Sequence, residues 1–362
     1  MRIIVALLLL SLFTWSAPAQ AQPDVPETLH PRQVFLQRDP DTGVNRLLFL
    51  DLLTGEAWPV NVAGERFTVT PNGVMFYAPG DNRVKLVMPD GRMSDHPFIQ
   101  PGRNTQRIDW VLDSDSQQIA WTHTEGVPGT MTTVTQVANL DGSNVHEVLV
   151  DGPRDGIRAM PVAFSHDRQS LYMDFQPDSV GDYTTFRQYA GLFSVDLESG
   201  ETQLLPGEPG CFCGAGLGSG WFLRLALTPD ALSFDLDAHE LDQGINATVP
   251  SLRLADFTQG GDILISADGT RAIYVLAQIR GFGTPGQIVQ AVLVLVDLQA
   301  LTQRVLGRDV DFLLHPVAWT EDNSAVILTS PSRPGTWKID VDGGSLAQIA
   351  SVTYLGSMGT GT

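Results

Sequence analysis

The sequence predicts an all-β protein built from one repeated unit, and two observations lead to this prediction. Short apolar runs recur in pairs around a polar turn, which opens with Ser, Thr or Asp and has Asn or Asp two residues later. A second kind of pair, with an acidic turn, follows most copies of the first. Together they give four antiparallel strands per repeat. The repeats follow one another at about 50 residues, which is typical of a β-propeller.

The first kind of pair supplies the two inner strands of each repeat. A short hydroxyl or carboxylate side chain at the start of its turn can bond nearby backbone N–H groups and so close a tight turn between strands. An isolated sheet of this kind cannot bury both faces, but neighbours stacked around an axis can. The copies are residues 67–78, 109–122, 162–175, 225–238, 263–276 and 317–330.

The second kind of pair supplies the two outer strands. Its copies are residues 47–60, 85–99, 137–150, 192–206, 293–307 and 336–350, with a degenerate version near 250–257 for the fifth blade. Residues 33–37 add a strand, and residues 351–356 can complete the first sheet by pairing the two ends of the repeat region. This count predicts a single β-propeller of seven four-stranded blades. The alternative is six blades, with residues 33–60 forming a partial blade shared with the C-terminus.

The N-terminus is typical of a secretory signal peptide. Residues 1–21 contain Arg2, an apolar run that is too short to span a membrane, and an A-x-A cleavage site at Ala19–Ala21, with Ala17–Ala19 as a second candidate. We expect a mature chain that starts at Gln22 or Gln20. The predicted organisation is a linker at 22–32, the propeller at 33–356 and a short tail at 357–362. The protein is therefore expected to be exported, whether secreted, periplasmic or at the cell surface.

The repeats resemble those of TolB-type and WD-like β-propellers. The resemblance is carried by FSHDRQSLYMDF with LFSVDLESGETQLLP, and by ISADGTRAIYVL with LVLVDLQALTQRVL, and it covers roughly residues 33–356. It implies the fold. Only Ser266–Gly269 keeps the full S-x-D-G turn, the WD dipeptide is absent, and we expect no room for the separate α/β domain of a TolB protein. The resemblance therefore does not imply the cellular role of TolB.

Composition limits the kinds of partner. The net charge of −19 disfavours binding to nucleic acid or to an anionic membrane, because both need a basic surface. No segment beyond the N-terminal apolar run is apolar enough to cross a bilayer, so we expect a protein that is not membrane-embedded. We also expect a monomer.

Motifs for catalysis or metal binding fail on their spacing. GLGSGW at 216–221 is out of register with the G-x-S-x-G nucleophile elbow, and His239-Glu240 lacks the second histidine of H-E-x-x-H. The acidic loops at 39–50 and 113–117 lack the glycine and the final acid of a calcium loop. We therefore expect no catalytic residue, no metal and no cofactor.

Cys211 and Cys213 are the two cysteines of the chain. Glycines around them make a turn feasible, and a turn can bring the two Cα atoms close enough for a local disulfide. A ring this small would stabilise the fold far less than a disulfide that closes a long loop. Two free thiols and half of a metal site remain alternatives.

The direction of the chain predicts which surface binds. In an antiparallel blade the turns inside each pair lie at one end of the propeller, here named the turn end. The connections between pairs and between blades lie at the other, the loop end. The loop-end connections vary most in length, and variable loops on a rigid scaffold are common binding sites. By our approximate assignment, they are also nearly neutral, whereas the rest of the chain is strongly acidic.

We expect the binding surface at the loop end. Arginine offers forked donors suited to carboxylates, and aromatic side chains offer stacking area. The candidate residues are Arg103, Arg107, Arg154, Arg158, Tyr183, Phe186, Arg187, Tyr189 and Arg280.

The sequence favours an exported, non-catalytic binding or protein-interaction scaffold. Its ligand is expected to be an anionic or carbohydrate-like group or a protein partner. Two alternatives stay open: the arginines pair locally with Asp151 and Asp155 and bind nothing, or the protein is a glycosidase- or lyase-like enzyme with acids at the central channel.

Overall fold

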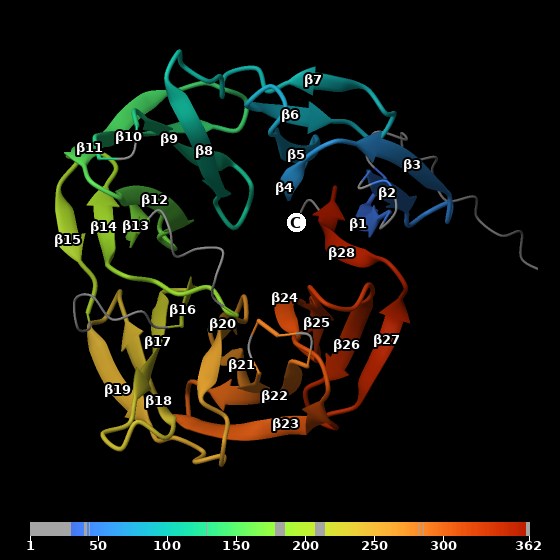
Figure 1. Cartoon of the computed structure of the whole chain (residues 1–362), viewed down its shortest axis with the longest axis vertical. Coiled ribbons are helices and arrows are strands. Elements are labelled where there is room, and N and C mark those ends of the chain that lie inside the picture. Colours follow the sequence, from blue (N-terminus) through green and yellow to red (C-terminus); the bar gives the residue numbers. More distant parts are fainter. Residues whose placement is uncertain are drawn as a thin grey trace, which may run out of the picture.

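Seven four-stranded antiparallel sheets are arranged as blades around a central axis (Figure 1). The structure is a computed structural model, and it describes residues 30–39, 42, 44–127, 129–177, 185–206, 214–281, 283, 284 and 286–359. The predicted all-β, seven-bladed propeller is confirmed. The predicted signal peptide lies outside the described residues, as do Tyr183, Cys211 and Cys213.

Each blade has its strands in the same order from the axis outward. Blade 1 consists of β28 (Thr353–Met358), β1 (Arg32–Arg38), β2 (Asn45–Asp51) and β3 (Ala57–Val62), and blade 2 of β4 (Glu65–Thr70), β5 (Gly73–Ala78), β6 (Arg83–Val87) and β7 (Met93–Asp95). Blade 3 consists of β8 (Thr105–Leu112), β9 (Gln118–Glu125), β10 (Met131–Asn139) and β11 (His146–Arg154), and blade 4 of β12 (Ile157–Phe164), β13 (Ser170–Pro177), β14 (Leu192–Asp196) and β15 (Thr202–Leu204). Blade 5 consists of β16 (Ala215–Gly218), β17 (Trp221–Leu227), β18 (Phe234–Glu240) and β19 (Ile245–Val249), and blade 6 of β20 (Gln259–Ile265), β21 (Arg271–Arg280), β22 (Ile288–Asp297) and β23 (Thr302–Val310). Blade 7 consists of β24 (His315–Trp319), β25 (Ala325–Thr329), β26 (Thr336–Asp340) and β27 (Leu346–Ala350).

The ring closes by pairing the two ends of the repeat region. The last strand, β28, is the inner strand of blade 1 and pairs antiparallel with β1, so that Arg32 faces Met358 in the register. Figure 1 shows the two strands side by side, β1 in blue and β28 in red. This is the closure that residues 351–356 predicted, and it leaves β1 with a partner on each edge.

The inner turns owe their shape to the predicted hydroxyl and carboxylate chemistry. In blade 6, the backbone N–H of Arg271 donates to Ser266 Oγ at 3.0 Å, and Ser266 Oγ donates to Asp268 at 2.6 Å. The bond from Ser266 is the largest cause that lowers the pKa of Asp268 to about 2. Gly269 has φ of 66°, in the left-handed region that glycine enters without strain, which explains the glycine of the S-x-D-G pattern.

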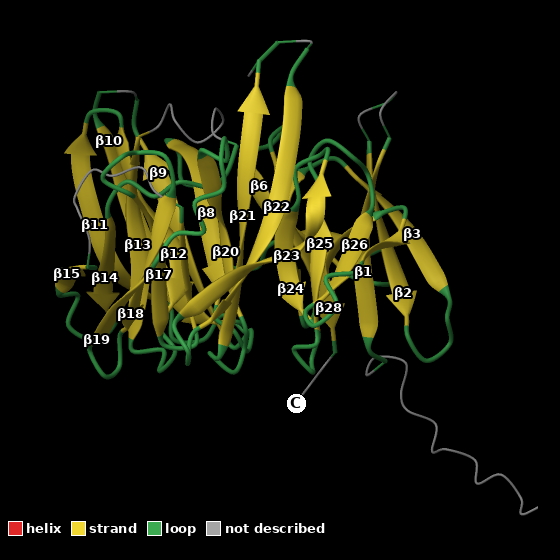
Figure 2. Ribbon diagram, turned by 90° about the horizontal axis from the view of Figure 1, so that it is seen from below, coloured by secondary structure: helices red, strands yellow, loops and turns green. Residues whose placement is uncertain are grey.

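Contacts between turns of neighbouring blades show that the inner turns share one end. Arg168 in the turn of blade 4 forms an ion pair with Asp113 in the turn of blade 3 at 3.1 Å. Ser219 in blade 5 donates to the carbonyl of Ser266 in blade 6 at 2.9 Å. The long connections lie at the opposite end, where the β21–β22 hairpin projects beyond the other strands (Figure 2).

Blade 5 differs from the sequence-based assignment. The turn that starts at Thr228 joins β17 to β18, the middle strands, and so lies at the loop end, although residues 225–238 were expected to be an inner pair. The inner strand is instead β16, whose sequence is Ala-Gly-Leu-Gly, and the outer turn is at 241–244. Residues 250–257, expected as an outer pair, contain no strand and connect blade 5 to blade 6.

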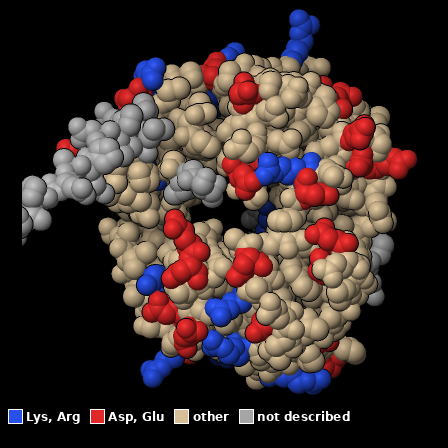
Figure 3. Space-filling view, turned by 180° about the vertical axis from the view of Figure 1, so that it is seen from behind, with Lys and Arg blue, Asp and Glu red and all other residues tan. Residues whose placement is uncertain are grey.

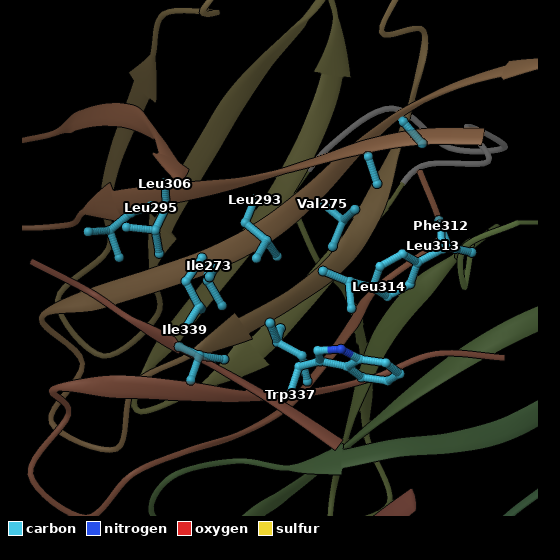
Figure 4. Close-up of a cluster of buried hydrophobic side chains, with 14 of the residues drawn as sticks. Ile273, Val275, Leu293, Leu295, Leu306, Phe312, Leu313, Leu314, Trp337 and Ile339 are labelled. Atoms are coloured by element: carbon cyan, nitrogen blue, oxygen red, sulfur yellow. The ribbon is translucent and has the colours of Figure 1, made fainter. Parts of the chain in front are cut away.

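Apolar side chains fill the spaces between blades. One cluster joins blades 6 and 7 and includes Ile273, Leu293, Leu314 and Trp337, which converge from β21, β22, β26 and the connection before β24 (Figure 4). Other clusters of the described residues join blade 1 to 2, 2 to 3, 3 to 4 and 5 to 6. The result is a rigid ring that fixes the seven inner strands around the axis.

Candidate binding site at the loop end of the channel

Charge on the inner strands is missing from the part nearest the turn end. These strands surround an opening at the centre of the ring, which Figure 3 shows from the turn end with Asp and Glu side chains around it. Every inner strand runs from the loop end to the turn end. The last three residues of each of these fully described strands carry no charged or histidine side chain. The charged and histidine side chains that precede them are Glu65, Arg66, Arg107, Asp109, Arg158, Asp262 and His315.

Two arginines of neighbouring inner strands share one buried carboxylate. Arg66 Nη1 on β4 donates to Asp109 on β8 at 2.8 Å, and Arg107 Nε donates to both carboxylate oxygens of Asp109 at 2.9 Å. The side chain of Asp109 is 8% exposed, whereas those of Arg66 and Arg107 are 29% and 37% exposed. We name these three residues the arginine cluster. Both arginine side chains are therefore partly exposed beside a buried carboxylate.

Arg66 is held in place by aromatic rings. Its guanidinium carbon lies 4.6 Å from the centre of the Tyr77 ring and 5.0 Å from that of Trp110. Burial lowers the pKa of Arg66, with Asp109 acting in the opposite direction, and burial raises the pKa of Tyr77. Such stacking fixes the plane of a guanidinium and thereby the direction of its donors.

The backbone at Arg66 is unusual for a strand. The register between β4 and β5 shifts between Glu65 and Thr68, which marks a β-bulge, and Arg66 has φ of 55°. A left-handed conformation at a residue other than glycine costs of order 1–3 kcal/mol, and such residues cluster at functional sites. The buried Nε of Arg66 has no hydrogen-bond partner among the described residues. A bulge of this kind re-aims a side chain, here toward β8 and Asp109.

An acid–imidazole pair lies on the inner strands of blades 6 and 7. Asp262 on β20 accepts a hydrogen bond from Nδ1 of His315 on β24. Asp262 also lies in a bulge, with φ of 54°. The pair therefore belongs to a different part of the ring from the arginine cluster of blades 2 and 3.

A strap formed by residues 185–191 links blade 4 to blades 6 and 7 at the loop end. It belongs to the connection from β13 to β14 and reaches toward β20 (Figure 1). Asp174 anchors it by accepting the backbone N–H groups of Ala190 and Gly191 at 3.1 and 2.8 Å. At its other end, Phe186 is 2% exposed and packs in the cluster of blades 6 and 7. Burial raises the pKa of Asp174 against the effect of these bonds.

The structure brings some of the predicted residues together. Arg107 and Arg158 lie near the loop-end start of β8 and β12, and Arg158 is 3% exposed. Arg187 and Tyr189 lie on the strap, with the guanidinium 5.0 Å from the tyrosine ring. Burial raises the pKa of Tyr189. The strap lies close to the Asp262–His315 pair, because the ring centres of Phe186 and His315 are 6.2 Å apart.

Other predicted residues lie elsewhere or serve the fold. Phe186 is part of the hydrophobic core. Arg103 is exposed in the connection before β8. Arg154 forms an ion pair with Asp151 at 2.7 Å, as the local-pairing alternative expected, and Arg280 forms one with Asp256 at 3.6 Å.

Sequence reasoning missed Arg66, Asp109, Asp262 and His315. Each lies inside or directly before a segment that reads as an apolar inner strand, so the repeat pattern concealed them. A usable signal was present: charged and histidine residues occur in the first part or the middle of several inner strands and are missing from their last three residues.

Comparison with known proteins supports the fold and leaves the site unassigned. No protein-family model matches the chain, and no curated protein matches its sequence. An oligogalacturonate lyase in complex with manganese is similar in structure, with 12% identity over 90% of this chain and 96% of that one, and a TM-score of 0.56. A prolyl endopeptidase has 12% identity and a TM-score of 0.57 over 90% of this chain and 50% of its own.

TolB proteins are also among the similar structures, as the repeat pattern predicted. TolB from Acinetobacter baumannii has 13% identity over 90% of this chain and 80% of that one, with a TM-score of 0.45. The likeness to the lyase and the endopeptidase, at 12% identity, shows a shared fold and nothing about activity.

Within the ranges given above, no three His, Cys, Asp or Glu side chains are grouped so that they could hold a metal ion. The same ranges contain no helix with the length and hydropathy needed to cross a membrane.

Proposed function

We propose that this propeller is an exported binding module whose ligand or partner contacts the loop end of the ring. The observation that supports it is the distribution of charge along the inner strands, where no charged or histidine side chain lies on the last three residues before the turn end. Hydrophobic packing between blades does not need these residues, and a ligand would reach them through the mouth of the channel. The expected ligand carries an anionic or carbohydrate-like group, or is a protein partner that presents one.

Charge reversal at each end of the ring tests which end binds. The ligand panel is a set of carboxylated and neutral saccharides with short acidic peptides, measured by calorimetry. Arg187→Glu changes an exposed strap residue at the loop end, and Arg92→Glu changes an exposed turn-end residue that pairs with Asp90. We expect Arg187→Glu to weaken any binder by about tenfold or more and Arg92→Glu to have no effect. Loss with Arg92→Glu alone, or a panel in which nothing binds, would contradict the proposal.

An enzyme remains the second candidate function, because His315 is oriented by Asp262. A carboxylate bonded to Nδ1 fixes the tautomer of an imidazole and prepares Nε2 to accept a proton. A pair of the same kind occurs outside the candidate site, where His30 contacts Asp51 at 2.6 Å. There Asp51 also accepts the backbone N–H groups of Leu53 and Thr54, and so the pair organises a turn. Product analysis of the same panel, with His315→Gln as the inactive reference, separates an enzyme from a binding module.

A further inference from the structure

We propose that the arginine cluster is a carboxylate-binding subsite, with Arg66 and Arg107 as the residues that contact the ligand. This inference rests on the proposed function and names the ligand chemistry of the same site. It identifies two specific side chains, on β4 and β8, that the loop-end hypothesis by itself does not distinguish from the others.

The first argument is the number of donors. Asp109 accepts one amino group of Arg66 and the Nε of Arg107, and all hydrogen bonds of Arg107 to the described residues come from that Nε. The two terminal amino groups of Arg107 and the second amino group of Arg66 are therefore available. Parallel N–H donors of this kind match the two oxygens of a carboxylate.

The second argument is charge. The cluster has two guanidinium groups and one buried carboxylate. Glu65 is nearby and exposed, and its charge raises the pKa of Arg66, but among the described residues no ion pair joins it to either arginine. An anion that enters the cluster would therefore meet two guanidinium groups that share one directly bonded carboxylate, in a protein whose net charge is −19.

The third argument is preorganisation. Arg66 is enclosed by Tyr77 and Trp110, and Tyr77 in turn donates its hydroxyl to Asn82, whose amide donates to the Thr105 carbonyl at 2.6 Å. The strained backbone at Arg66 aims its side chain into this setting. A donor that is already fixed loses little conformational freedom when a ligand binds. The arginine cluster is thus preorganised for a ligand, since its donors are held in position by the surrounding side chains.

Glucuronate and glucose are the probes, because they differ chiefly by a carboxylate. Calorimetry of the purified protein at low ionic strength should show binding of glucuronate at least about tenfold tighter than that of glucose, and weaker binding as salt is added. Arg107→Gln should weaken glucuronate binding by about tenfold or more, and a cooperative melting transition shows that the variant is folded. Arg107→Lys should be intermediate, since it keeps the charge and loses the fork.

Asp109→Asn gives the sharpest result. It removes the carboxylate that competes for both arginines while keeping the shape of the side chain, so glucuronate should bind several-fold tighter. A purely structural role for the cluster predicts no such gain. Unchanged binding in Arg107→Gln, or weaker binding in a folded Asp109→Asn protein, would overturn the proposal.

The proposed function and the subsite can fail separately. If Arg187→Glu abolishes glucuronate binding and Arg107→Gln does not, the loop end binds but the subsite is wrongly assigned. If only the turn-end variant Arg92→Glu abolishes it, both proposals are wrong.

Discussion

Gly216→Ala is expected to destabilise the protein by about 2–3 kcal/mol, because β16 lies too close to β20 for any side chain at this position. A Cβ at Gly216 would be 2.6 Å from the carbonyl oxygen of Ile263 and 2.7 Å from its Cβ. The backbone of β20 cannot shift at this point without a large cost in free energy, so blades 5 and 6 would have to separate. The φ angle is not in the left-handed region, so the cost is one of packing alone.

Gly218→Ala is the matched control on the same strand. A Cβ there would be 3.7 Å from Ile265, which is ordinary van der Waals contact. We expect its stability to equal that of the parent protein or to exceed it slightly, since alanine costs less conformational entropy than glycine. Urea denaturation of the two variants measures the difference. Equal stabilities would show that the close approach of β16 to β20 is not real.

Removal of β28 is expected to have the second large effect. Deleting residues 353–362 takes Met358, which is 4% exposed, out of the cluster of blades 1 and 2, and it leaves β1 as an unpaired edge. It also removes the bond from the Tyr354 N–H to Thr336 Oγ1 at 2.9 Å, which joins blade 1 to blade 7. We expect a loss of several kcal/mol and association through the exposed edge of β1.

Deletion of residues 360–362 alone is the control for this truncation, since it leaves β28 complete. Melting temperature and gel filtration are the measurements. A truncated protein that lacks β28 but melts with the parent and remains monomeric would contradict the role of β28 in closing the ring.

The fold could be predicted because its signal is local and repeated. In five blades the inner turn starts with a hydroxyl or carboxylate residue, at Thr70, Asp113, Ser165, Ser266 and Thr320, and so the sequence gives the same signal five times. Blade 5 shows the limit of this signal. Thr228 bonds the N–H of Ser233 and donates to Asp230, the same chemistry as Ser266, but in the turn between the middle strands. Turn chemistry identifies a hairpin and not its position within the blade.

The inner strand of blade 5 was missed for a related reason. The sequence of β16 has two glycines and no alternation, and at Gly216 the contact with β20 leaves no room for a side chain. That constraint comes from a strand more than 40 residues away in the chain and leaves no periodic signal.

For the candidate site, chain direction predicted a surface, the loop end, and its role in binding stays a prediction. Arg107, Arg158, Arg187 and Tyr189 lie at that end of the ring. Arg66 and Asp109 could not be paired from sequence, because their contact joins two blades and depends on a bulge in β4. Nor could the sequence show that Phe186 crosses from blade 4 to the core of blades 6 and 7.

The most direct test of a ligand site at the loop end of the channel compares two tryptophans. Trp110 lies beneath Arg66 in the arginine cluster, and Trp58 lies beneath Arg32 near the turn end, with guanidinium-to-ring distances of 5.0 and 5.9 Å. In protein labelled with ¹⁵N-tryptophan, Trp110→Phe and Trp58→Phe assign the two indole N–H resonances. Titration with glucuronate should shift the resonance of Trp110 and leave that of Trp58 in place. A shift of Trp58 alone, or no shift of Trp110 at saturating glucuronate, would contradict the account.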